Sequence, residues 1–195
     1  MSTPGSAGGN ARGRATVRSI ETAAVRLALE QGAAALTVDQ ICDAAGIKQR
    51  TFFNHFRTKE DALLGSALPV IDEQRTREYL TSHDTGVLTG ALTLVDIPGT
   101  GPDEDDLATD RLRLLMASPA LAERQASRLL PLVDEMRAII RLKLVTLRSA
   151  EPDERLDDAA TTITQIVGAL LLRPRRSETQ DPPLAELRWV WPHLL

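Results

Sequence analysis

The stretch TVDQICDAAGIKQRTFFNHFRTKEDALL, residues 37–64, decides how the N-terminal part of this chain folds. Thr37 is a favourable N-cap, and the apolar residues after it keep a helical period, so a short helix is predicted over 38–45. Gly46 ends that period and marks a tight turn, after which a second helix is predicted over 49–56. A short helix, a glycine turn and a second helix are typical of a helix-turn-helix.

The second helix of this motif is predicted to have one buried and one polar face. Phe52 and Phe56 lie four residues apart and can pack together on the preceding helices. A polar face of this kind can enter a major groove about 12 Å wide, where Gln or Asn pairs with adenine and Arg with guanine. The candidate base-reading residues are Gln49, Arg50, Thr51 and Asn54. Periodicity alone also permits a three-helix core whose polar face is merely solvated.

The residues before the motif complete a small domain. A further amphipathic helix is predicted over 14–31, ending at Gly32, and the three helices together form a DNA-binding domain over 14–60. Residues 1–13 contain four glycines and one proline and are expected to form a flexible arm. Arg12 in this arm either reaches the DNA or belongs to a solvated tail.

Charge is distributed unevenly along the chain. The whole protein has a formal net charge of -4, which by itself would disfavour a nucleic-acid partner. Residues 1–60, however, hold eight Lys and Arg against five acids, a balance of +3, whereas the remaining 135 residues hold 15 against 22, a balance of -7. A small basic module joined to a larger acidic one is expected where only the first contacts phosphate.

The composition favours an all-α protein in the cytoplasm. Aromatic residues make up 3% of the chain, and runs that alternate in the manner of strands are nearly absent. Cys42 is the single cysteine and is expected to be a small buried residue, so neither a disulfide nor a Cys/His zinc cluster is predicted. No apolar run approaches the ~18–20 residues of a membrane span, and no signal peptide begins the chain. No metal or other cofactor is expected.

Residues 37–64 resemble the DNA-binding region of the TetR family of bacterial repressors. The family pattern runs from a Thr cap, through an Ala-Gly-Val/Ile turn and an aromatic recognition helix, to Ser/Thr-Lys-Glu. The residues that match it in register are Thr37, Ala45, Gly46, Ile47, Thr51, Phe52, Phe53, His55, Phe56, Thr58, Lys59, Glu60 and Leu63. The resemblance implies a sequence-specific transcriptional regulator that binds a double-stranded DNA operator.

The resemblance also implies which residues contact the DNA backbone. Thr37, at a helix N-terminus, and His55 match phosphate contacts, and Lys59 matches a backbone clamp at the start of the next helix. Two residues that differ from the family pattern are also expected to contact the DNA backbone. Lys48 stands where a Ser often caps the recognition helix, and Phe53 stands where a Tyr often bonds phosphate.

Beyond the motif the sequence predicts a larger helical bundle over 61–195, which we expect to be the regulatory and dimerisation domain. Pro69 is expected to bend the first of its helices near the middle, and Pro131 is expected to kink or locally break the long fourth one. The predicted helices span 59–81, 84–95, 105–117, 119–148, 153–173 and 183–194.

In the family this bundle holds an inducer cavity, and its last two helices build a homodimer. The resemblance therefore implies a homodimer on a pseudo-palindromic operator, released by a small inducer. The predominance of aliphatic residues predicts that this inducer is hydrophobic. The candidate pocket residues are Ile71, Tyr79, Leu112, Met116, Met136 and Thr164. The candidate dimer residues are Ile163, Ile166, Val167, Leu170, Leu171, Leu187, Trp189, Val190 and Leu194. Each of them could equally be a core residue within one subunit.

Other function classes are less well supported. The Gly- and acid-containing loop over 99–106 lacks the Lys-Ser/Thr of a phosphate-binding loop, and His55 has no predicted nucleophile or orienting carboxylate beside it. An enzyme, and therefore a catalytic residue, is not expected. Two alternatives stay open: an architectural protein that tolerates any DNA sequence, and a regulator that responds to no ligand.

Overall fold

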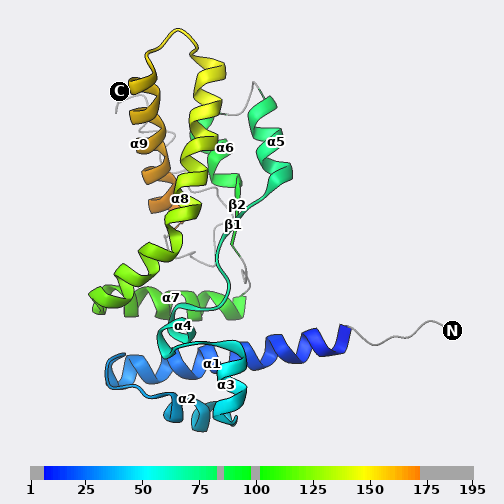
Figure 1. Cartoon of the computed structure of the whole chain (residues 1–195), viewed down its shortest axis with the longest axis vertical. Helices are drawn as coiled ribbons and strands as arrows, with labels where there is room; N and C mark the ends of the chain where they lie inside the picture. The colour runs from blue at the N-terminus through cyan, green and yellow to red at the C-terminus, as the bar shows by residue number, and fades with distance from the viewer. Residues whose placement is uncertain (1–6, 83–85, 98–101, 172–195) are drawn as a thin grey trace, which may run out of the picture. The chain divides into compact units, whose positions relative to one another are not determined.

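The computed structural model describes residues 7–82, 86–97 and 102–171, and most of these residues lie in α-helices (Figure 1). The prediction of an all-α fold is confirmed. Two strands of two residues each, β1 (Val70–Ile71) and β2 (Val95–Asp96), form one antiparallel pair. None of the helices in the described ranges is long and apolar enough to cross a membrane. The chain divides into two compact units.

The N-terminal unit comprises Met1–Leu68 and Gly101–Ser127. Its core takes one large apolar side chain or more from each helix. Its helices are α1 (Ala7–Gln31), α2 (Val38–Ala45), α3 (Gln49–His55), α4 (Lys59–Leu64), α7 (Pro102–Ala117) and the start of α8 (Pro119–Leu147). The buried residues that represent them in the core are Ile20, Ile41, Phe52, Leu63, Leu114 and Leu121.

Two boundaries of this unit differ from the prediction. α1 begins at Ala7, so the expected arm over 1–13 is helical from its seventh residue. A helix that has already nucleated gains one hydrogen bond for each residue it adds, so it extends into a sequence that would not start a helix alone. The unit also contains residues 101–127, which the sequence assigned to the regulatory domain over 61–195.

The predicted bent helix over 59–81 is wrong. α4 ends at Leu64, Gly65 follows with a φ of +88°, and a new helix, α5 (Glu73–Thr81), begins only after β1. Positive φ suits glycine and ends the helical path, and Pro69 lacks the amide hydrogen that a continuous helix would need. Asp72 then caps α5, because its carboxylate accepts a hydrogen bond from the Arg75 amide at 2.8 Å.

The second unit comprises Pro69–Thr100 and Arg128–Leu195. Within it α5, α6 (Val87–Thr93), the rest of α8 and α9 (Asp153–Leu171) run alongside one another (Figure 1). Their buried side chains form a second core that includes Tyr79, Leu94, Met136, Ile140 and Val167. The predicted helix over 183–194 lies outside the described residues.

Lys143 is a buried lysine in this second core. Its ammonium donates a hydrogen bond to the Tyr79 carbonyl at 2.7 Å and another to the Ser82 carbonyl, and it lies 5.3 Å from the centre of the Tyr79 ring. A cation at the last carbonyls of a helix complements the helix dipole, so Lys143 fastens the end of α5 to α8. Tyr79 donates its hydroxyl to the Val87 carbonyl, and burial raises the pKa of Tyr79 to about 12.

Candidate nucleic-acid interface

α2 begins with a reciprocal cap. The Thr37 hydroxyl accepts from the Gln40 amide at 3.3 Å, and the Gln40 side-chain oxygen accepts from the Thr37 amide at 2.9 Å. Thr37 is therefore the N-cap that the sequence predicts. Gln40 was missed, although Thr-x-x-Gln before an apolar run is a recognised signal for such a cap. Gln40 also exchanges hydrogen bonds with Gln31, which joins the start of α2 to the end of α1.

The turn between α2 and α3 depends on Gly46. Its φ of +66° is left-handed, and its amide donates to the carbonyls of Cys42 and Asp43. Ile47 then donates its amide to Cys42 at 2.9 Å and closes the turn. Side chains with a Cβ are strained at this φ, so the glycine in the sequence motif has a backbone reason. The turn sets the direction in which α3 leaves α2.

α3 has the two faces that the sequence predicts. Phe52 and Phe56 are buried in the core, with ring centres 5.7 Å apart. Phe53 stands against the edge of Phe52, with ring centres 5.4 Å apart, yet keeps 54% of its surface exposed. The polar candidates lie on the same short helix: Gln49, Arg50 and Asn54 are exposed, and Thr51 is half-buried.

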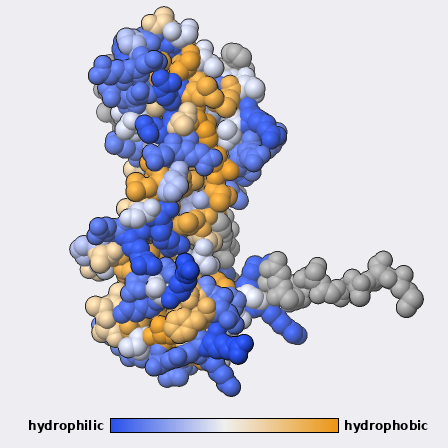
Figure 2. Space-filling model, in the orientation of Figure 1, coloured by the Kyte–Doolittle hydropathy of each residue, from blue (hydrophilic) through white to orange (hydrophobic). Residues whose placement is uncertain are grey.

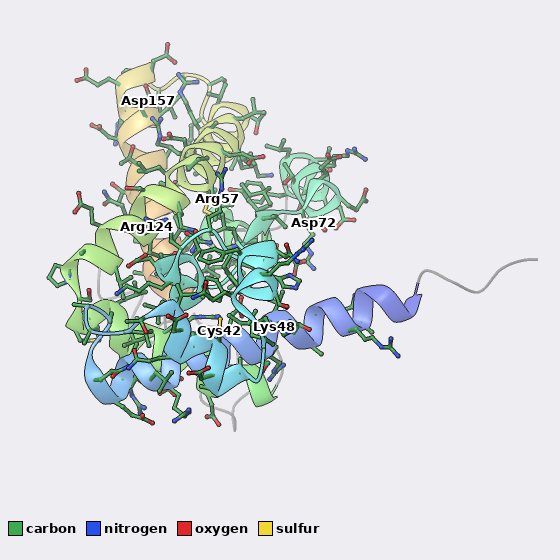
Figure 3. All side chains as sticks on the ribbon, turned by 60° about the horizontal axis from the view of Figure 1, so that its bottom comes forward. Cys42, Lys48, Arg57, Asp72, Arg124 and Asp157 are labelled. Atoms are coloured by element: carbon green, nitrogen blue, oxygen red, sulfur yellow. The ribbon has the colours of Figure 1, made fainter. Side chains whose placement is uncertain are left out.

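Basic side chains stand at both ends of α3. Lys48 is its N-cap and makes no capping hydrogen bond with its side chain, which leaves an exposed ammonium in place of a Ser cap. His55 ends the helix and Arg57 follows it, both exposed; Lys48 and Arg57 are labelled in Figure 3. In Figure 2 hydrophilic residues border the lower edge of the molecule, where Figure 1 shows α2 and α3. Such a surface can approach a phosphate backbone.

Cys42 lies on the inner side of α2, as predicted. It is buried in the core of the N-terminal unit. Burial, together with the carboxylates of Asp39 and Asp43, raises the pKa of the Cys42 thiol. A thiol that stays protonated is a poor nucleophile, so Cys42 contributes packing.

Lys59, the predicted backbone clamp, also makes contacts within the N-terminal unit. Its ammonium donates to the carbonyls of Ala34 and Leu36, at 3.0 and 2.7 Å. These carbonyls belong to the loop that leads from α1 to Thr37, so two of the three donor hydrogens of Lys59 hold this loop against α4. The partners lie more than twenty residues away in the sequence, and no local pattern announces them.

Replacing Lys59 by methionine is expected to lower the free energy of unfolding by about 1–2 kcal/mol, because two carbonyls lose a charged donor. Urea denaturation measures this loss. Lys48→Met is the matched control, since the Lys48 side chain is exposed and caps nothing; it should leave stability unchanged. If Lys59→Met unfolds at the wild-type urea concentration and only reduces the salt dependence of DNA binding, Lys59 contacts phosphate directly.

Two arginines fasten α4 within the N-terminal unit. At its start Arg124, from α8, donates to the Asp61 carboxylate at 2.9 Å and to the Thr58 hydroxyl at 3.3 Å. At its end Arg111, from α7, donates to the Leu63 carbonyl at 3.1 Å. Partial burial alone would raise the pKa of Asp61, but the hydrogen bonds from Arg124 and Thr58 and the charge of Arg124 outweigh it and lower that pKa.

Arg111 also forms an ion pair with Glu21 of α1. The nitrogen and oxygen are 2.8 Å apart, and the two side chains are only 23% and 12% exposed. The other oxygen of Glu21 accepts from the amide and hydroxyl of Ser66, at 2.7 and 3.0 Å. A Cβ at Gly65 would come within 2.9 Å of the Arg111 guanidinium carbon, so this position needs glycine for space as well as for φ.

The candidate pocket residues are divided between the two units. Leu112 and Met116 belong to the N-terminal unit, and Met116 is 82% exposed. The other candidates belong to the second unit, where Tyr79 and Met136 are core residues packed with Ile71, and the Thr164 hydroxyl donates to the Ala160 carbonyl at 2.8 Å. These four side chains fill the core of their unit, so they have a packing role.

The candidate dimer residues of α9 separate into two groups. Val167 is completely buried in the second core, and Ile163 and Leu171 are partly buried against that core, so these three contribute to the packing of the second unit. Ile166 is 38% exposed and Leu170 is half-buried. The residues divide into buried and more exposed groups because α9 packs one side on α6. Leu187, Trp189, Val190 and Leu194 lie outside the described residues.

Comparison with known proteins supports the DNA-binding assignment. Residues 20–64 match the family model described as bacterial regulatory proteins, tetR family. The matched segment runs from the core residue Ile20 of α1 through α2 and α3 to the end of α4. No curated protein matches the chain significantly.

Proposed function

From the match of residues 20–64 to the TetR family of bacterial regulatory proteins, this chain is a DNA-binding transcriptional regulator, and we propose that it represses transcription. In this proposal it binds a pseudo-palindromic operator as a homodimer and leaves it when a small hydrophobic ligand binds. The observation that carries the proposal is α3, a helix whose buried phenylalanine fixes it to the core while Arg50 and Asn54 stay exposed.

The short length of α3 supports a homodimer. A helix of seven residues contacts only a few base pairs, and a two-fold dimer doubles the recognised sequence. The exposed Ile166 and the half-buried Leu170 of α9 supply apolar surface for such a contact. The second copy would place its α3 in the next major groove on the same side of the duplex.

In this proposal, release by a ligand acts through α4. Lys59 of α4 holds the loop that precedes α2. α4 is itself held by Arg111 from α7 and Arg124 from α8. A ligand that binds more tightly to an arrangement with displaced α4 would shift the population away from DNA. If no apolar compound stabilises the protein in a thermal-shift screen, a regulator without a ligand is the better description.

Selection of bound duplexes from random DNA tests the proposal directly. We expect an enriched motif with two inverted half-sites, their centres about one helical turn of 10–10.5 base pairs or a multiple of it apart. Two related half-sites would support the homodimer, and one unrepeated half-site would argue against it. Binding with a steep salt dependence but without any enriched motif would instead identify an architectural DNA-binding protein.

Replacing Arg50 by alanine is expected to cost about 1–3 kcal/mol in binding, confined to one base pair of each half-site. The reason is that an exposed arginine on the reading face can pair with guanine through two donors. Arg57→Ala is the control, because Arg57 follows α3 and should weaken all duplexes alike. Titration of single-base-pair variants of the selected site distinguishes the two patterns, and equal loss on all duplexes for Arg50→Ala would remove Arg50 from the readers.

A further inference from the structure

Asp39 and Gln49 connect the two helices of the helix-turn-helix by a side-chain hydrogen bond. Asp39 lies in the first turn of α2, and Gln49 is the first residue of α3. The Gln49 Nε2 amide donates to the Asp39 carboxylate. Both side chains are exposed, so the bond lies on the surface and not in the core. Asp39 was not among the residues that the sequence assigned to the site.

The chemistry of the two groups determines how the amide of Gln49 is turned. An ionised carboxylate only accepts hydrogen bonds, whereas a side-chain amide has one accepting oxygen and two donor hydrogens on its nitrogen. Asp39 can therefore hold only the nitrogen end of Gln49. The carbonyl oxygen and the second N–H hydrogen of Gln49 remain for another partner. Without Asp39 the amide could turn over freely, because its two ends differ little in size.

We propose that Asp39 is a positioning residue that holds the Gln49 amide in one orientation and thereby sets a preference for an A·T base pair where Gln49 reads the DNA. Adenine presents the complementary pair in the major groove, an N6 donor beside an N7 acceptor, whereas guanine presents two acceptors. This inference rests on the proposed function and adds the base-pair class to it.

Two simpler roles of Asp39 make different predictions. A carboxylate in the first turn of α2 stabilises the helix dipole whether or not Gln49 is present. A carboxylate can also accept directly from cytosine N4, which would make Asp39 a reader of its own base pair. In either case Gln49 would keep its base preference when Asp39 is changed.

The experiment compares the full-length wild-type protein with Asp39→Asn, Asp39→Ala, Gln49→Ala and the double variant Asp39→Asn/Gln49→Ala. Asp43→Asn is the matched control, because it removes the same charge from the same helix. Each protein is titrated with the selected duplex and with duplexes that carry the other three base pairs at the position sensitive to Gln49→Ala. Thermal unfolding of each variant reports any separate contribution of Asp39 to stability.

We expect wild type and Asp43→Asn to prefer A·T at this position by about 5- to 150-fold, the range of one good bidentate contact. Relative to Asp43→Asn, which removes the same charge, both Asp39 variants should bind the A·T duplex more weakly and the other duplexes about equally, and should therefore lose most of this preference. Adding Gln49→Ala to Asp39→Asn should then remove little more. Alanine makes no side-chain hydrogen bond, so Asp39→Ala shows whether loss of the bond alone is sufficient.

Three outcomes would overturn the inference. The first is an A·T preference in both Asp39 variants equal to that of Asp43→Asn. The second is a changed preference at a base pair that Gln49→Ala does not affect, which would identify direct reading by Asp39. The third is a wild-type preference for a base pair other than A·T at the Gln49 position. Failure of the proposed function looks different, because the wild-type protein would then enrich no motif at all.

Discussion

Replacing Arg111 by alanine is expected to lower the free energy of unfolding of the N-terminal unit by about 3 kcal/mol, at the lower end of the range for a broken buried ion pair. Glu21 would lose its cationic partner at a site that leaves its side chain only 12% exposed, and the Leu63 carbonyl would lose its donor. The free energy of unfolding of natural domains is about 5–15 kcal/mol in total, so this variant should lose DNA binding at a markedly lower temperature than wild type. Urea denaturation followed by circular dichroism measures the loss.

Arg113→Ala is the matched control for this prediction. Arg113 lies on the same helix and pairs with Asp110 at 2.7 Å, but its side chain is 67% exposed. Exposed pairs contribute about 0–1 kcal/mol, so this variant should unfold close to wild type. Replacing Glu21 and Arg111 together by methionine should recover part of the loss, because no buried charge is then left unpaired. Equal effects of Arg111→Ala and Arg113→Ala would show that the buried pair contributes nothing special.

Replacing Phe52 by alanine is expected to cost about 3–5 kcal/mol, the usual range for a fully buried aromatic side chain. Phe52 has no exposed surface and touches both Phe53 and Phe56. The cavity would lie beneath α3, so the helix should lose its fixed position on the core and the protein its sequence-specific binding. Denaturation and duplex titration at low temperature follow the two effects in the same samples.

Phe53→Ala separates packing from DNA contact on the neighbouring residue. Phe53 is 54% exposed, so its truncation should cost well under 1.5 kcal/mol of stability, about half or less of the cost of burying a phenylalanine. Its effect should appear in the affinity for DNA, where the ring has a sugar, a phosphate or a thymine methyl to contact. A Phe53→Ala variant that loses as much stability as Phe52→Ala would contradict the two-faced description of α3.

The helix-turn-helix could be predicted because its signals are local. The Thr37 cap, the Gly46 turn and the spacing of Phe52 and Phe56 each act within about four residues, the distance over which caps and helical periods operate. The predicted helices over 38–45 and 49–56 accordingly match α2 and α3 to within one residue. The failed prediction over 59–81 has the opposite cause. Its apolar period continued past Gly65, and the period gave no warning that this glycine adopts a positive φ.

The sequence by itself determined where α2 and α3 begin and end and which residues of α3 face outward, because backbone propensity and amphipathic period are short-range properties. Only the tertiary structure decided which polar groups meet. Lys59 donates to two carbonyls of a distant loop, Glu21 accepts from Arg111 ninety residues away, and Asp39 accepts from Gln49 across the turn. Such contacts depend on how separate helices pack, and packing is set by the whole core and not by any one segment of the chain.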